Sequence, residues 1–183
     1  MSRQSFPTAQ AVIFAFFVNS IMDRVKLISD IEAAFKGVSL DGGIGIYEAE
    51  VIDDYGDEEE RNKAKIKDST SWVKWEEIPK EILKRYYTTF CFVDSKGFKF
   101  LIPAYMRFTL KYCEIDDSAS IDATIYALQP SNYNFDGFAQ LLNKKQKKVI
   151  SRFLEYLILE VGENWVDTDV ALLAYEAYWY RYN

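Results

Sequence analysis

The chain has 183 residues, the size of one domain, and its 49% hydrophobic and 27% charged residues exclude a disordered or fibrous protein. Its 28 acidic residues outnumber 22 basic ones, and the net charge of −6 argues against general nucleic-acid binding, which relies on cations that neutralise phosphates. Histidine is absent, which excludes Ser-His-Asp and Cys-His nucleophiles and histidine metal sites.

Residues 1–20 are predicted to be an N-terminal extension of a single globular domain at residues 21–183. Ala11 to Val18 is an unbroken apolar run, but it is far shorter than the roughly 20 residues that span a bilayer. Arg3 and the stretch Val18-Asn19-Ser20 imitate poorly the basic start and cleavage site of a secretory signal. We therefore expect a cytoplasmic protein that does not bind membranes.

Two helices are expected early in the domain. Apolar residues recur at helical spacing between Ile21 and Phe35, with Ser20 as N-cap and Gly37 just beyond the end. A second, shorter helix is expected from Ile44 to Tyr55.

The next segment, Asp57 to Lys67, is almost wholly charged. The pairs Asp57/Arg61 and Glu59/Lys63 have the i,i+4 spacing and the order of signs that support a helix. The apolar content is too low for a buried helix, so the segment is predicted to be a solvated one.

A β-hairpin is predicted at about residues 88–102. Thr88 to Val93 is rich in strand-forming residues, Asp94 to Gly97 is typical of a turn, and Phe98 to Ile102 alternates. Pro103 is interpreted as the residue that ends the second strand. The predicted fold class is therefore α+β, predominantly α, with several helices packed around one hairpin.

The remaining segments are predicted to be helical or loop. Asn143 and Gln146 form a capping-box pattern, which starts a helix that ends at Gly162. Asp167 or Thr168 caps the last helix. The other expected helices run from Pro79 to Tyr87, from Ala104 to Tyr112 and from Ser118 to Leu128, and Ser131 to Gly137 is expected to be a loop.

Motifs for cofactors and metals are incomplete. Gly37 to Gly43 has the first glycines of a phosphate loop without the Lys-Ser/Thr, and Gly43-Ile-Gly45 lacks the third glycine of a dinucleotide fingerprint. The chain has no Cys-x-x-Cys, and its two cysteines, Cys91 and Cys113, are expected to be buried, reduced thiols. We predict no cofactor and no metal site.

Carboxylate clusters leave an enzymatic alternative open. They occur at Asp53-Asp54, at Asp57 to Glu60 and at Glu114 to Asp117. Paired carboxylates serve acid–base chemistry and bind hard cations. The pattern is unspecific in a chain with 28 acidic residues, so a carboxylate-dependent, possibly metal-assisted enzyme is the first alternative function.

A cluster of cations crowds the start of the 143–162 helix, where the helix dipole favours anions. Such a cluster can bind phosphate, RNA or an acidic partner; the competing interpretation is neutralisation by the acidic segment 114–122. The anion-binding candidates are Lys144, Lys145, Lys147, Lys148 and Arg152.

Two further features favour protein binding or self-association. The exposed acids of the charged helix can meet a basic surface, and the C-terminal aromatic residues are of the types found at interface hot spots. The partner-binding candidates are Asp57, Glu58, Glu59, Glu60, Tyr178, Trp179 and Tyr182. The leading prediction is a non-enzymatic protein-interaction module of the immunity or adaptor kind.

Several short motifs occur in a fixed order along the chain. They include Trp75-Glu-Glu-Ile-Pro79, Gly97-Phe-Lys-Phe100 and Pro103-Ala-Tyr-Met106. The chain resembles, from about Ile28 to Leu159, a family of small bacterial proteins of unknown function. The resemblance implies a bacterial, cytoplasmic, single-domain protein and transfers no catalytic residue.

Overall fold

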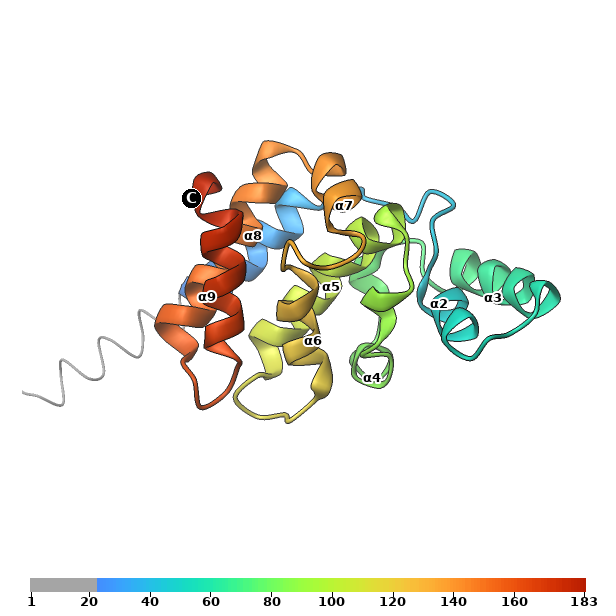
Figure 1. Ribbon diagram of the computed structural model, residues 1–183, viewed down its shortest axis with the longest axis horizontal. Helices are drawn as coiled ribbons and strands as arrows, with labels where there is room; N and C mark the ends of the chain where they lie inside the picture. Colours follow the sequence, from blue (N-terminus) through green and yellow to red (C-terminus); the bar gives the residue numbers. More distant parts are fainter. Residues whose placement is uncertain (1–22) are drawn as a thin grey trace, which may run out of the picture.

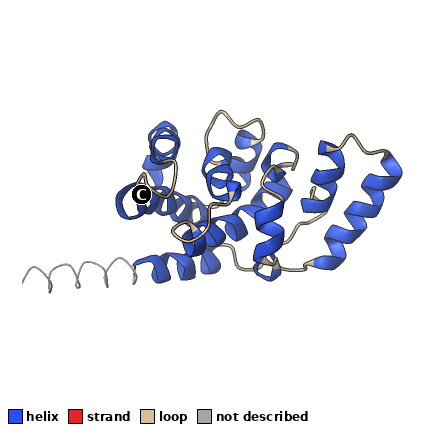
Figure 2. Cartoon of the chain, turned by 90° about the horizontal axis from the view of Figure 1, so that it is seen from below, coloured by secondary structure: helices blue, strands red, loops and turns tan. Residues whose placement is uncertain are grey.

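The computed structural model describes residues 23–183 (Figure 1). The predicted extension, residues 1–20, lies outside the described residues. Within residues 23–183 the regular elements are all helices and no strand is present (Figure 2). The described part of the chain is therefore all-α, and the predicted α+β class is wrong.

The α-helices are interspersed with short 3-10 and π turns. In chain order they are the helix at residues 23–34, α2 (Ile46–Asp53), α3 (Glu58–Ser71), η1 (Trp75–Glu77), α4 (Lys80–Arg85), η2 (Thr89–Cys91), α5 (Ser95–Tyr112), α6 (Ala119–Ala127), α7 (Phe135–Leu141), α8 (Lys144–Tyr156), η3 (Leu157–Val161), α9 (Thr168–Ala177) and η4 (Trp179–Tyr182).

The predicted hairpin is replaced by η2 and the first half of α5. Asp94, predicted to lie in the turn, is the N-cap of α5, and its side chain accepts the backbone N–H of Gly97 at 2.8 Å. Pro103 lies inside the helix and does not end a strand. The prediction failed because the apolar face of α5 is so wide that Phe98 to Ile102 is nearly all apolar, and such a short run does not distinguish a strand from a helix.

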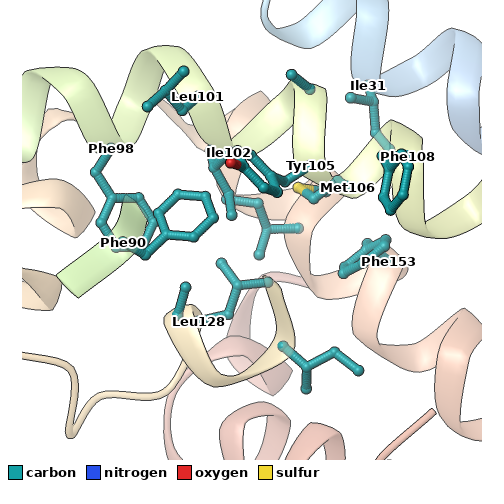
Figure 3. Packing of buried hydrophobic residues seen from close by; sticks show 14 of the residues in the cluster. Ile31, Phe90, Phe98, Leu101, Ile102, Tyr105, Met106, Phe108, Leu128 and Phe153 are labelled. Carbon is teal, nitrogen blue, oxygen red and sulfur yellow. The ribbon is translucent and has the colours of Figure 1, made fainter. Parts of the chain in front are cut away.

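Helix α5 is the centre of the hydrophobic core (Figure 3). Twelve of its 18 residues are buried, and it packs against α4, α6, α7 and η1. Its side chains share one cluster with Ile31 of the first helix, Leu128 after α6 and Phe153 of α8. The hydroxyl of Tyr105 is buried there and donates to the carbonyl oxygen of Tyr86 at 2.6 Å. This buried hydroxyl therefore has the hydrogen-bond partner that a buried donor needs.

The start of α5 also fixes the loop that leads to α2. The backbone N–H of Ile44 donates to Asp94 Oδ1 at 3.1 Å, so one carboxylate oxygen joins this loop to the helix cap. The approach is close enough that a Cβ atom at Gly97 would lie 1.9 Å from the carbonyl oxygen of Ile44. Gly97 is therefore required by contact between two backbones.

The first helix is tied to the body by three ion pairs, one of which joins Glu32 to Arg107 of α5 at 3.5 Å. Arg24 Nη1 lies 2.7 Å from Glu114 Oε2, and Asp30 pairs with Arg152 of α8. The hydrogen bond from Arg24 holds the pKa of Glu114 below its ordinary range. Hydrogen bonds from Lys26 and Arg152 likewise lower the pKa of Asp30. Both carboxylates therefore favour their charged forms.

Several predicted helix ends are confirmed. Asn143 and Gln146 form the reciprocal capping box of α8, Asp167 caps α9, and Ser118 caps α6. Gly37 follows the first helix with a φ of 76°, the left-handed conformation that suits glycine after a helix. Cys113 is buried as expected, but Cys91 is exposed, and neither forms a disulfide.

Candidate functional site

Helices α2 and α3 form an arm at one end of the molecule, on the opposite side from α8 and α9 (Figure 1). We call residues 46–71 the α2–α3 arm. Helix α3 packs mainly against α2, and Ala64 and Asp68 are the buried residues among its 14. A helix that is polar almost all round needs specific contacts to hold it in place, because it has no apolar stripe to bury.

The contact that holds α3 is made by the buried carboxylate of Asp68. Its two oxygens accept the backbone N–H groups of Tyr47 and Glu48 at 3.0 Å and 2.9 Å, at the N-terminus of α2. Gly45 is the N-cap residue of α2, and a Cβ atom there would lie 2.3 Å from Asp68 Cγ. Asp68 thus takes the place of the missing cap side chain. Burial raises the pKa of Asp68, while the two backbone N–H groups act to lower it.

We expect Asp68→Asn to loosen the arm without unfolding the body. The amide group presents an NH₂ to one of the two backbone N–H groups, so one buried hydrogen bond is lost at a cost of about 1–3 kcal/mol. Hydrogen–deuterium exchange in residues 46–71 should become faster, while exchange in α5 stays unchanged. Asp136→Asn, an exposed acid in the first turn of α7, is the matched control. Wild-type exchange rates in the Asp68→Asn arm would show that Asp68 does not hold it.

The N-terminus of α3 carries an acidic surface, which we call the acidic tip: Asp54, Asp57, Glu58, Glu59 and Glu60, all exposed. Asp57 accepts the backbone N–H of Glu60 at 2.9 Å, and Glu60 Oε2 accepts that of Asp57 at 3.0 Å, so these two acids cap the helix. Glu58 and Glu59 take no part in the cap. The tip therefore combines a fixed backbone with carboxylates that face solvent.

Of the two predicted i,i+4 pairs, one is confirmed. Lys63 Nζ lies 2.6 Å from Glu59 Oε1. Arg61, predicted to pair with Asp57, instead donates to Glu48 Oε1 of α2 at 3.1 Å. Arg61 is thus a second tie between α3 and α2, and it leaves the Asp57 carboxylate to the helix cap.

The C-terminal aromatic residues pack largely inward. Trp179 is fully buried, and its indole N–H donates to the carbonyl oxygen of Leu128 at 2.7 Å. Tyr178 and Tyr182 are half-buried, and the ammonium of Lys147 lies 5.1 Å from the ring centre of Tyr182. Of the three aromatic partner-binding candidates, Tyr178 and Tyr182 therefore reach the surface.

The predicted cation cluster is divided between two environments. Lys147 contacts the C-terminal rings, and Arg152 pairs with Asp30. In the acidic segment 114–122, Glu114 forms an ion pair with Arg24, and Asp116 forms one with Lys84. These two acids therefore do not neutralise the cation cluster, contrary to the competing interpretation. The remaining three candidates are exposed on the first turns of α8: Lys144, Lys145 and Lys148.

The third carboxylate cluster lines a cavity of about 660 Å³ between α4, α6 and the segment before α9. Glu114, Asp116 and Asp117 contribute to the wall, together with Trp165. A general acid needs a pKa raised toward the working pH, whereas Arg24 lowers the pKa of Glu114. Within residues 23–183, no group of three or more cysteine, aspartate or glutamate side chains is arranged to hold a metal ion.

Comparison with known proteins adds a family and no function. Residues 23–183 match the model of a family described as a family of unknown function, DUF6714, so the match reaches beyond the predicted Ile28–Leu159 to the last residue. Neither the curated proteins nor the solved structures yield a match. Among the helices at residues 23–183, none combines the length and apolar character needed to cross a membrane.

Proposed function

The chain belongs to the family of unknown function DUF6714, and we propose that it acts by binding a partner protein through the acidic tip of the α2–α3 arm. The observation that carries this proposal is the exposure of α3, in which Ala64 and Asp68 are the buried residues of 14. A helix that adds so little to the core is free to serve as a binding element. A protein of the immunity or adaptor kind would act by binding its partner through such an exposed helix.

The chemistry of the tip indicates a basic partner. Glu58 and Glu59 lie in the first turn of α3, next to the cap residues Asp57 and Glu60, and Lys63 is paired with Glu59. Clustered charges of one sign speed the encounter with a surface of the opposite sign, and their effect weakens as salt is added. The capping box keeps the backbone of the tip in one conformation, which lowers the entropy cost of binding.

Charge reversal at the tip tests the proposal. Glu58→Lys/Glu59→Lys leaves the capping acids Asp57 and Glu60 in place, so α3 should still fold. Affinity capture from cells that make the protein should retain a partner on the wild-type chain and lose it on this variant. With the purified partner, the association rate constant at low salt should fall about tenfold or more.

The matched control is Glu160→Lys/Glu163→Lys, which makes the same change in charge at two exposed acids near the end of η3. This control should bind the partner as the wild type does. Equal loss in both variants would show a response to net charge alone, and full binding by the tip variant would exclude the tip as the contact surface.

A further inference from the structure

A second cavity, of about 420 Å³, lies where the end of the first helix, the start of α5 and the start of α8 meet. We call it the lysine cavity. Its charged lining residues are Lys36, Lys96, Lys99 and Asp41. Three cations and one carboxylate make this wall positive, although the whole chain has a net charge of −6.

The lysines retain unused hydrogen-bond donors. An ammonium group has three N–H donors. Lys99 Nζ donates to the carbonyl oxygen of Leu141 at 2.9 Å. Lys96 Nζ lies 3.1 Å from the carbonyl oxygen and 3.2 Å from the carboxylate of Asp41. These contacts hold the two ammonium groups at the wall and leave two donors on Lys99 and one on Lys96.

Lys36 adds a third cation from a different segment. It is exposed in the turn after the first helix, and within residues 23–183 it forms no ion pair. The three lysines thus come from two segments far apart in the sequence, the turn after the first helix and the start of α5, and line one cavity. Their positive charges repel one another unless an anion lies between them.

Another part of the lining is polar and is held by hydrogen bonds within the protein. Gln146 is buried, and its side chain bonds to the backbone N–H of Asn143 at 3.1 Å and to the carbonyl oxygen of Ala34 at 3.2 Å. The first bond belongs to the α8 cap, and the second joins α8 to the end of the first helix beside the cavity. Because this part of the lining is fixed by hydrogen bonds within the protein, the cavity is formed before a ligand arrives.

We propose that the lysine cavity binds a small molecule that carries a phosphate group. A phosphate dianion matches the net charge of the lining and offers several acceptor oxygens to ammonium groups that approach from different directions. The volume lies within the range of small-molecule sites, about 300–1,000 Å³, and it exceeds the needs of a phosphate ion alone. The ligand class is therefore a phosphomonoester such as a nucleotide or a sugar phosphate.

Calorimetric titration of the full chain with AMP, glucose 6-phosphate and inorganic phosphate tests the proposal, with adenosine as the uncharged probe. At least one phosphomonoester should bind, and adenosine should not. Tighter binding of AMP than of glucose 6-phosphate would identify a nucleotide ligand, and the reverse order a sugar phosphate. Absence of binding by both phosphomonoesters at low salt would overturn the proposal, as would binding of adenosine equal to that of AMP.

Lysine substitutions locate the site. Lys36→Gln/Lys99→Gln should weaken binding about tenfold or more, and Lys36→Gln alone, at an exposed position, should weaken it by a smaller factor without affecting folding. Lys65→Gln/Lys111→Gln removes the same charge from two exposed positions outside the lysine cavity and should leave binding unchanged. Equal weakening in this control pair, or wild-type binding by Lys36→Gln/Lys99→Gln, would contradict the proposed site.

Discussion

Trp179→Ala should lower the free energy of unfolding by about 3–5 kcal/mol, the range for deleting a buried aromatic side chain. The indole is fully buried, donates to the carbonyl oxygen of Leu128 at 2.7 Å and packs against Phe135 at a ring distance of 5.7 Å. The variant loses this packing and leaves a buried carbonyl oxygen without its donor. Chemical denaturation followed by circular dichroism gives the measurement.

The matched control is Trp165→Ala, at an indole that is 50% exposed. This substitution removes the same side chain from a surface site, so its cost should be much smaller. Equal stability of the Trp179→Ala chain and the wild type would mean that the C-terminal residues are not part of the core. In that case the aromatic tail would be free to face a partner.

Gly97→Ala should lower the free energy of unfolding by about 1–3 kcal/mol, because a new Cβ atom overpacks a tight contact. The added atom would lie 1.9 Å from the carbonyl oxygen of Ile44, and a backbone atom cannot rotate away. The direction of the change in stability is informative, because Gly→Ala inside an exposed helix usually raises the free energy of unfolding by about 0.5–1 kcal/mol. We also expect the clash to displace the loop around Ile44, which leads into the α2–α3 arm.

Gly137→Ala in α7 is the control for this prediction. The new Cβ atom would lie 2.3 Å from the hydroxyl oxygen of Ser95, which can rotate to another position. The Gly137→Ala chain should unfold at nearly the denaturant concentration of the wild type. A Gly97→Ala chain as stable as this control would show that α5 and the 43–45 loop are not packed as described.

Local chemistry explains which parts of the fold could be predicted. Helix caps depend on residues that are neighbours in the sequence, so the capping box of Asn143 and Gln146 was recognisable. The first half of α5 was not, because its apolar face is so wide that a short apolar run there does not distinguish a helix from a strand. Helix α7 was missed as well, and Phe135 to Gly137 was taken for loop.

The candidate sites likewise include features that local sequence predicts and features that depend on distant residues. The solvent exposure of α3 followed from the charged composition of Asp57 to Lys67, whereas the capping box of Asp57 and Glu60 was not predicted. The role of Asp68 depends on two backbone groups about twenty residues away, and the burial of Trp179 depends on a carbonyl 51 residues away. The lysine cavity is assembled from Lys36, Lys96 and Lys99, and no sequence pattern links the first of these to the other two.

The most direct test of partner binding through the acidic tip is photocrosslinking in cells that make the protein. A photoreactive phenylalanine derivative would replace Glu58 at the tip or, in a second chain, Glu160 on η3. The account predicts a covalent adduct with one partner protein from position 58 and none from position 160. An adduct from position 160 alone, or no adduct from position 58, would contradict it.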